Sequence, residues 1–130
     1  PSYLKERGVP QTPEELKDHK IIGVTSAFAS EDWRFGTREK SVVRIHPRIR
    51  CNNNAAAVSM AASGWGLTRV LSYQVGREVT DGRLRLVLEN LEEPPLPVHL
   101  VHGGTRSTAS KVRAFMDLAA TRLRANPVLG

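Results

Sequence analysis

The sequence predicts an α/β fold in which short strands alternate with helices. Arg48 to Cys51 has the character of a strand and runs directly into a stretch of small, helix-forming residues that ends at Ser63. Lys20 to Thr25 repeats the strand signal with three branched apolar residues. At 130 residues, 40% of them hydrophobic and 25% charged, the chain is long enough for a domain with its own core.

Two short helices are expected before the first strand. Ser2 to Arg7 predicts a helical turn that Gly8 stops. A second helix starts at Thr12, because Thr12 can cap it, Pro13 suits the first helical position and Glu15 completes a capping box.

The residues after the first strand predict a loop and a hairpin. Ser26 to Asp32 has the composition of a loop. Trp33 to Phe35 and Ser41 to Ile45 are apolar, short and separated by a segment with Gly36, which indicates two antiparallel strands.

The segment after Cys51 predicts a helix docked on a sheet. An asparagine can accept a hydrogen bond from the free N–H groups at a helix start. Gly64 suits the left-handed conformation that ends a helix, and a further strand is expected at Trp65 to Leu67. Small residues that fall on one helical stripe allow close packing on a sheet: Ala55, Val58, Ala61 and Ala62.

The last third of the chain predicts two more helices and two more strands. Leu71 to Thr80 is expected as a short helix, and Asp81 to Leu88 as a turn into a strand. After a proline cluster, Val98 to Val101 predicts a strand, and Ser107 or Thr108 to about Arg124 a helix. The apolar residues of that helix follow a core-facing stripe: Val112, Phe115, Met116, Ala119 and Leu123.

A binding site is expected where the helix starts after Cys51. Open α/β sheets hold ligands at the carboxyl ends of their strands, and a helix start there offers N–H donors to small polar or anionic groups. Asn52, Asn53 and Asn54 add side-chain amides to the same corner. A single helix cap accounts for one asparagine but not for an adjacent pair. The alternative that these residues only cap the helix still stays open.

Several short motifs occur in an order that is typical of one protein family. They are Ser2-Tyr3-Leu4, Gly8-Val9-Pro10, Thr12-Pro13-Glu14-Glu15-Leu16, Trp33-Arg34-Phe35, Asn52-Asn53, Ala62-Ser63-Gly64-Trp65-Gly66, Gly82-Arg83-Leu84, Val98-His99-Leu100-Val101 and Lys111-Val112-Arg113-Ala114-Phe115. Each motif is weak alone, but their collinear order resembles the effector-binding domain of LysR-type transcriptional regulators. The family usually has a proline after the strand at Val98, where this chain has Gly103-Gly104.

The resemblance implies an α/β effector domain of the periplasmic-binding-protein-like type II fold. Residues 1–93 correspond to the second lobe, residues 94–97 to the hinge, and residues 98–130 to the closing strand and helix of the first lobe. In this family a small effector lies between the lobes, so Asn52, Asn53, Asn54 and Leu96 are the expected effector-binding residues. The family further implies a cytoplasmic homodimer or tetramer that contacts operator DNA only through an N-terminal helix-turn-helix absent from this chain. The alternative is a freestanding solute-binding protein of the same fold.

Composition and motifs argue against other functions. The net charge of +6 includes a basic run from Arg34 to Arg50, but its charges alternate with apolar residues as on the exposed face of a strand.

His99 and His102 point to opposite faces of the predicted strand, so we expect no metal site and no cofactor. No nucleophile motif accompanies His102-Gly103-Gly104, so we expect no enzyme. The sequence shows no membrane span or signal peptide, and the lone Cys51 is expected to be buried.

Overall fold

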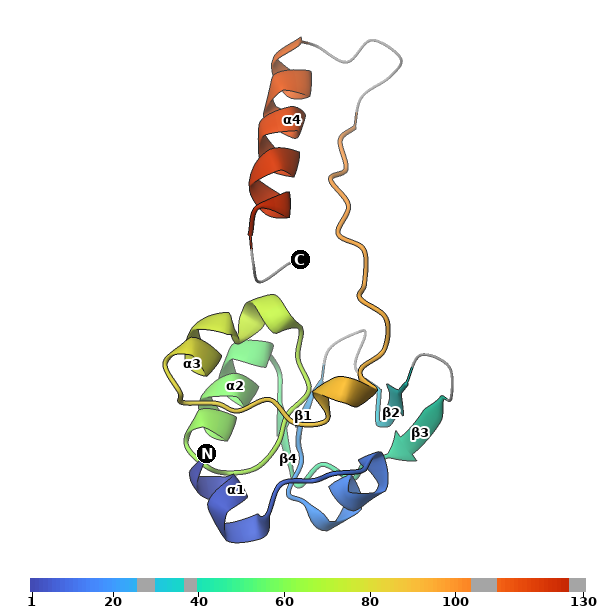
Figure 1. Cartoon of the computed structure of the whole chain (residues 1–130), viewed down its shortest axis with the longest axis vertical. Helices are drawn as coiled ribbons and strands as arrows, with labels where there is room; N and C mark the ends of the chain where they lie inside the picture. Colours follow the sequence, from blue (N-terminus) through green and yellow to red (C-terminus); the bar gives the residue numbers. More distant parts are fainter. Residues whose placement is uncertain (26–29, 37–39, 104–109, 127–130) are drawn as a thin grey trace. The chain divides into compact units, whose positions relative to one another are not determined.

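A computed structural model describes residues 1–25, 30–36, 40–103 and 110–126 (Figure 1). The chain divides into two compact units, Pro1–Pro94 and Pro95–Gly130, and each is considered by itself. Most of the predicted loop at Ser26 to Asp32, the tip of the predicted hairpin and the expected start of the last helix lie outside the described residues.

The first unit contains short helices and strands that alternate as expected for an α/β fold. In chain order they are α1 (Ser2–Arg7), η1 (Pro13–Asp18), β1 (Ile22–Val24), β2 (Asp32–Phe35), β3 (Ser41–Arg44), β4 (Ile49–Cys51), α2 (Asn54–Ala62), η2 (Ser72–Gln74), α3 (Gly76–Thr80) and η3 (Glu89–Leu91), where η marks a 3₁₀ helix.

The central sheet pairs β1 with β4 in parallel, and Ile22 lies opposite Ile49. Helix α2 packs on this sheet through a buried cluster of Ile22, Cys51, Ala57 and Ala61 (Figure 1). The small side chains of Ala57 and Ala61 let the helix lie close to the strands. Of the predicted stripe only Ala61 belongs to this cluster, and the other three members line a groove on another face of α2: Ala55, Val58 and Ala62.

The strand predicted at Trp65 to Leu67 is reduced to one bridge. The Ile22 N–H donates to the Leu67 carbonyl at 2.8 Å, and the Leu67 N–H donates to the Lys20 carbonyl at 2.9 Å. A Cβ at Gly66 would overlap the carbonyl of Lys20, so only glycine permits this close approach. Gly64 ends α2 with a φ of 83°, which confirms the predicted left-handed stop.

The predicted hairpin is confirmed. β2 and β3 pair antiparallel, with Trp33 opposite Val43. Phe35 and Val43 point inward and form a second buried cluster with Leu16, Ile21, Ile45 and Leu88. The hairpin therefore packs on η1 and on Ile21, the residue just before β1.

The predicted strand between Arg83 and Leu88 is wrong. The turn at Asp81 and Gly82 is present, but the N–H groups of Arg83 and Leu84 both donate to the Glu78 carbonyl at 2.8 and 3.0 Å. These bonds hold the segment against the end of α3. Leu88 has a φ of 60°, which interrupts an extended run and turns the chain into η3.

Two predicted helices differ from the expectation, because one is a 3₁₀ helix and the other is interrupted. The helix at Thr12 is the 3₁₀ helix η1, in which the Thr12 hydroxyl donates to Glu15 instead of accepting from the backbone. The helix predicted for Leu71 to Thr80 divides into η2 and α3 at Val75, whose φ of −126° is not helical. The Gln74 side chain accepts from the Leu71 N–H at 3.1 Å and favours the tighter first turn.

The second unit consists of an extended segment and helix α4 (Ser110–Arg124). Val98 to Val101 is extended but makes no strand pairing with any described residue, so the predicted strand is wrong. The predicted helix is confirmed over its described part, yet none of the described residues of this unit is buried. No helix in the described ranges has the length and apolar character of a membrane span.

Candidate functional site

The site predicted from the sequence lies where β4 leads into α2. Asn53 is the N-cap of α2, and its Oδ1 accepts from the Ala56 N–H at 2.8 Å. Its Nδ2 donates to the Oδ1 of Asn52 at 2.9 Å, so both polar atoms of Asn53 are occupied. The capping alternative therefore describes Asn53 correctly.

Asn52 and the first turn of α2 keep unused donors. Within the described residues, the Asn52 Nδ2 and the backbone N–H groups of Asn54 and Ala55 make no hydrogen bond. Asn52 is exposed, and the N-terminal end of a helix carries a partial positive charge. This corner can therefore accept an anionic or strongly polar group.

Thr25 lies beside this corner, and sequence reasoning missed it. Its N–H and its hydroxyl both donate to the Cys51 carbonyl, at 2.8 and 3.2 Å. Thr25 therefore joins the carboxyl end of β1 to that of β4, next to Asn52. The available signal was its position as the last residue of the predicted strand at Lys20 to Thr25.

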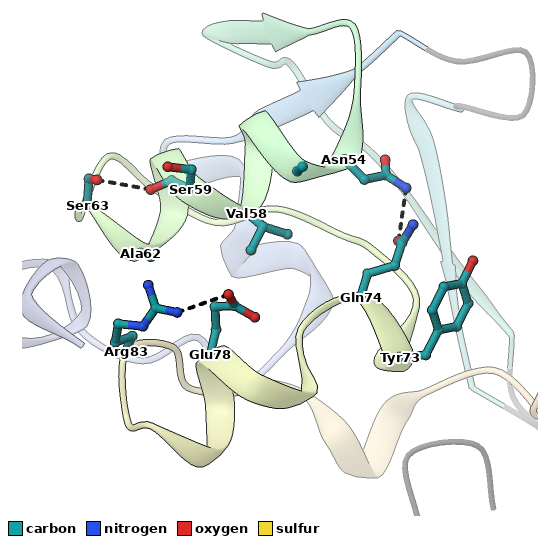
Figure 2. Close-up of a pocket in the computed structure, with 10 residues that line it drawn as sticks. Asn54, Val58, Ser59, Ala62, Ser63, Tyr73, Gln74, Glu78 and Arg83 are labelled. Atoms are coloured by element: carbon teal, nitrogen blue, oxygen red, sulfur yellow. Dashed lines mark hydrogen bonds and ion pairs between the residues drawn. The ribbon is translucent and has the colours of Figure 1, made fainter. Parts of the chain in front are cut away.

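Asn54 belongs to a different feature, an open groove of about 580 Å³ between α2 and the η2–α3 segment (Figure 2). Its Nδ2 donates to the Gln74 Oε1 at 2.9 Å and joins the two walls at one end. Sequence reasoning found no part of this groove except Asn54. The lining residues are Asn54, Ala55, Val58, Ser59, Ala62, Ser63, Tyr73, Gln74, Glu78 and Arg83.

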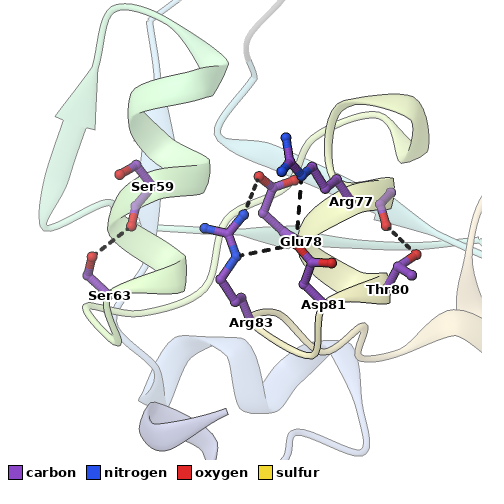
Figure 3. Close-up of polar contacts among 8 residues, drawn as sticks. Ser59, Ser63, Arg77, Glu78, Thr80, Asp81 and Arg83 are labelled. Atoms are coloured by element: carbon purple, nitrogen blue, oxygen red, sulfur yellow. Dashed lines mark hydrogen bonds and ion pairs between the residues drawn. The ribbon is translucent and has the colours of Figure 1, made fainter.

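The other end of the groove is charged, but its charges are paired. Arg83 Nη2 lies 3.0 Å from Glu78 Oε1, and Arg83 Nε lies 4.0 Å from Asp81 Oδ2 (Figure 3). Arg77 adds a second contact to Asp81, in which Arg77 Nε lies 3.7 Å from Asp81 Oδ2. Exposed pairs of this kind contribute about 0–1 kcal/mol each, so they set the local charge pattern more than the stability.

The basic run of the sequence surrounds one acidic residue in the described structure. Arg50 donates to the Glu31 carboxylate. This hydrogen bond, with the nearby charge of Arg50 and smaller contributions of Arg44 and His46, lowers the pKa of Glu31 from its ordinary value of 4.5. Arg34, Arg44 and Arg50 are exposed on their strands, as the alternating pattern predicts.

Leu96 and Cys51 complete the predicted set. Leu96 is 74% exposed and belongs to the second unit, so its role in effector binding stays a prediction. Cys51 is buried as expected, and its Sγ lies 3.6 Å from the Met60 Sδ. Among the residues that the structure covers, no group of three histidine, cysteine or acidic side chains is placed to hold a metal ion.

Comparison with known proteins gives transcriptional regulators as relatives. A transcriptional regulator of Xanthomonas campestris is 30% identical over 128 residues, which are 95% of this chain and 37% of that protein. The regulator PgrR of Escherichia coli is 32% identical, over 90% of this chain and 40% of its own length. Both are described as helix-turn-helix-type regulators, and the chain spans about two fifths of the length of the curated relatives it matches.

Solved structures agree with the sequence relatives. CrgA, a LysR-type transcriptional regulator of Neisseria meningitidis, superimposes with a TM-score of 0.63 at 25% identity, over 71% of this chain and 31% of that one. The regulatory domain of AphB from Vibrio vulnificus gives a TM-score of 0.71 at 20% identity, over 93% of this chain and 60% of that one, which shows the fold.

The family match covers nearly the whole chain. The LysR substrate binding domain family matches residues 1–124, which include every element from α1 to α4. Together with the α/β unit and its regulator relatives, this match shows that the chain belongs to the LysR substrate binding domain family, with the periplasmic-binding-protein-like type II fold.

Proposed function

We propose that this chain is the ligand-sensing part of a LysR-type transcriptional regulator. In this proposal residues 1–93 form the second lobe, residues 94–97 the hinge, and residues 98–130 the closing part of the first lobe. A small anionic effector binds between the lobes and changes the activity of a DNA-bound dimer or tetramer in the cytoplasm. Operator contacts are made by a helix-turn-helix outside residues 1–130.

The corner at Asn52 carries this proposal. It combines an exposed amide donor with two unused N–H groups at the positive end of α2. Two or three free donors at one helix start suit a carboxylate or a phosphate, which can accept several hydrogen bonds. Leu96 supplies an apolar contact from the hinge side.

Two other functions receive less support. A freestanding solute-binding protein shares the fold, but the curated relatives are transcriptional regulators. An enzyme would need a nucleophile or an acid and base near the site. The polar groups at the Asn52 corner are amides, N–H donors and a threonine hydroxyl, which favour binding over catalysis.

The test separates ligand binding from helix capping. In the regulator that contains this domain, Asn52→Ala removes the free amide and leaves the cap of α2 intact. We expect the concentration of small carboxylic acid needed for half-maximal reporter expression to rise roughly tenfold, as for the loss of a hydrogen bond to a charged group. The melting temperature stays unchanged, because Asn52 is exposed.

Asn53 provides the matched control. Asn53→Ala removes the cap and destabilises the domain by about 1 kcal/mol, whereas Asn53→Ser keeps a capping oxygen and restores that stability. If Asn52→Ala left the response unchanged while Asn53→Ala lowered only the melting temperature, the asparagines would serve the helix alone and the proposed site would be rejected.

A further inference from the structure

Arg69 makes three contacts that join two separate parts of the first unit, the end of β2 and the segment at Glu93. Its Nη1 donates to the Arg34 carbonyl at 3.0 Å, at the end of β2. Its Nη2 donates to the Glu93 carboxylate at 2.8 Å. Its guanidinium carbon lies 5.4 Å from the centre of the Phe35 ring, within the range of a cation–π contact.

The segment that Arg69 holds is the last one before the chain leaves this unit. Glu93 is followed directly by Pro94, where the first unit ends. One further bond joins the same partners, because the Gly36 N–H donates to the Leu91 carbonyl at 2.7 Å. Leu91 packs against the buried cluster around Phe35, so the hairpin end and the exit segment are joined at two points.

The geometry of these contacts requires an arginine. A guanidinium has donors that point in different directions in one plane, so it can serve a backbone carbonyl and a carboxylate while its face covers a ring. A lysine has a single ammonium at a different reach, and it cannot occupy both acceptor positions with the same packing on Phe35. The three contacts therefore act as a set.

We propose that Arg69 is a positioning residue that fixes the exit segment Leu91–Glu93 to the end of the β2–β3 hairpin. It determines where the connection to the second unit begins. With Arg69 in place the connection starts at Pro94. Without Arg69 it starts about two residues earlier, because Glu93 is exposed and makes no other contact of this kind among the described residues. Glu92 then keeps only the bond of 3.3 Å from its N–H to the Glu89 carbonyl, at the end of η3.

The consequence for signalling rests on the proposed function. If the lobes close around an effector, the stiffness of the hinge decides how much of the closure is passed from one lobe to the other. A longer free connection absorbs the movement. Arg69 would then keep the two lobes coupled without touching the effector.

The contacts alone add little to stability, which makes the proposal separable from folding. The Arg69 and Glu93 side chains are 38% and 41% exposed, and an exposed pair contributes about 0–1 kcal/mol. Loss of the set should change the local order of the exit segment and leave the core of the unit folded.

The test is ¹⁵N relaxation on the 130-residue chain. In the wild type we expect backbone order parameters of about 0.85 from Leu91 to Glu93, as in rigid backbone. Arg69→Met keeps the aliphatic stem over Phe35 and removes the donors, so Glu92 and Glu93 should fall below about 0.6, the range of flexible segments. Residues in β1 and α2 should keep the wild-type values.

Arg77→Met is the matched control, because Arg77 is 86% exposed and its only ion pair among the described residues is the long contact to Asp81 (Figure 3). It should leave Leu91 to Glu93 unchanged. Arg69→Lys should give intermediate order parameters, and Glu93→Ala should reproduce the effect of Arg69→Met from the other partner.

Unchanged order at Glu92 and Glu93 in both Arg69→Met and Glu93→Ala would overturn the proposal, as would an equal loss in Arg77→Met. Full order in Arg69→Lys would show that charge alone is sufficient and would overturn the requirement for the guanidinium. None of these results depends on an effector, so failure here leaves the test at Asn52 unaffected.

Discussion

The two units of this chain differ in what covers their apolar residues. In the first unit the strands, α2 and the hairpin bury Ile21, Ile22 and Ile45 almost completely. In the second unit Phe115 on α4 is 65% exposed and Val101 is 88% exposed. In both units the apolar residues recur with the period of the helix or strand that carries them. The difference teaches that periodicity selects a face for burial, while burial itself requires a second surface.

The largest expected difference in stability comes from truncating one large apolar side chain to alanine in each unit. Ile22→Ala should lower the free energy of unfolding by about 3–4 kcal/mol, because Ile22 is 1% exposed and a cavity would remain. Phe115→Ala should change it by less than about 0.5 kcal/mol, as for an exposed residue. Urea denaturation followed by circular dichroism measures both. Equal losses in the two variants would show that α4 is covered in solution.

A glycine pair sharpens the role of close packing in the first unit. Gly66→Ala should destabilise it by about 3 kcal/mol, because the added methyl overlaps the Lys20 carbonyl and breaks the bridge to Leu67. Gly82→Ala meets nothing within 4 Å and adds only the cost of its positive φ, about 1 kcal/mol. Thermal melts compare the two. Similar losses would mean that backbone conformation, not overlap, limits both positions.

Measurements of self-association test whether the exposed apolar residues of the second unit form contacts between chains. Apolar patches of this kind favour association, so we expect the 130-residue chain to form dimers or larger oligomers as its concentration rises. Phe115→Glu should raise the dissociation constant roughly thirtyfold, about 2 kcal/mol, as for the loss of an aromatic anchor. Light scattering over a concentration series measures the oligomers.

Val42→Glu is the control for this measurement. Val42 is 58% exposed on β3 of the first unit, so the substitution adds the same charge at an exposed apolar position. It should leave association unchanged. A monomer at all concentrations, or an equal effect of the two variants, would show that the second unit does not mediate association.

The smallest effect concerns the ion pair on the hairpin side of the first unit. Arg50 lowers the pKa of Glu31 from its ordinary value of 4.5. The charged carboxylate therefore stabilises the folded state at pH values above that ordinary pKa. This contribution is lost as the pH falls through the lowered pKa of the folded state. The melting temperature of Glu31→Gln should therefore lie slightly below that of the wild type near pH 7, and the difference should disappear as the pH falls below the lowered pKa of the folded state.

Arg50→Met checks the cause from the other partner. It should give the same small loss near neutral pH and the same convergence with the wild type in acid. A difference that persists at low pH would show that packing of the side-chain stem, and not the charge, is responsible.

The sequence by itself determined the elements whose signals are local. Capping chemistry placed the start of α2 among the three asparagines, of which Asn53 is the cap, and glycine chemistry placed its end at Gly64. Alternating apolar residues placed β1, the hairpin and β4. The order of motifs indicated the family, which the match over residues 1–124 then showed. These features depend on neighbours a few residues away, so the chain carries them in its own pattern.

Tertiary structure decided the features that depend on distant partners. Arg83 to Leu88 has the pattern of a strand, but bonds to Glu78 and the left-handed Leu88 prevent it from pairing. Val98 to Val101 has the same pattern and pairs with no described residue. The roles of the three asparagines also diverged in space: Asn53 caps α2, Asn54 joins Gln74, and Asn52 keeps its donor. Adjacent residues point in different directions at a helix start, and only the folded chain determines which partner each side chain meets.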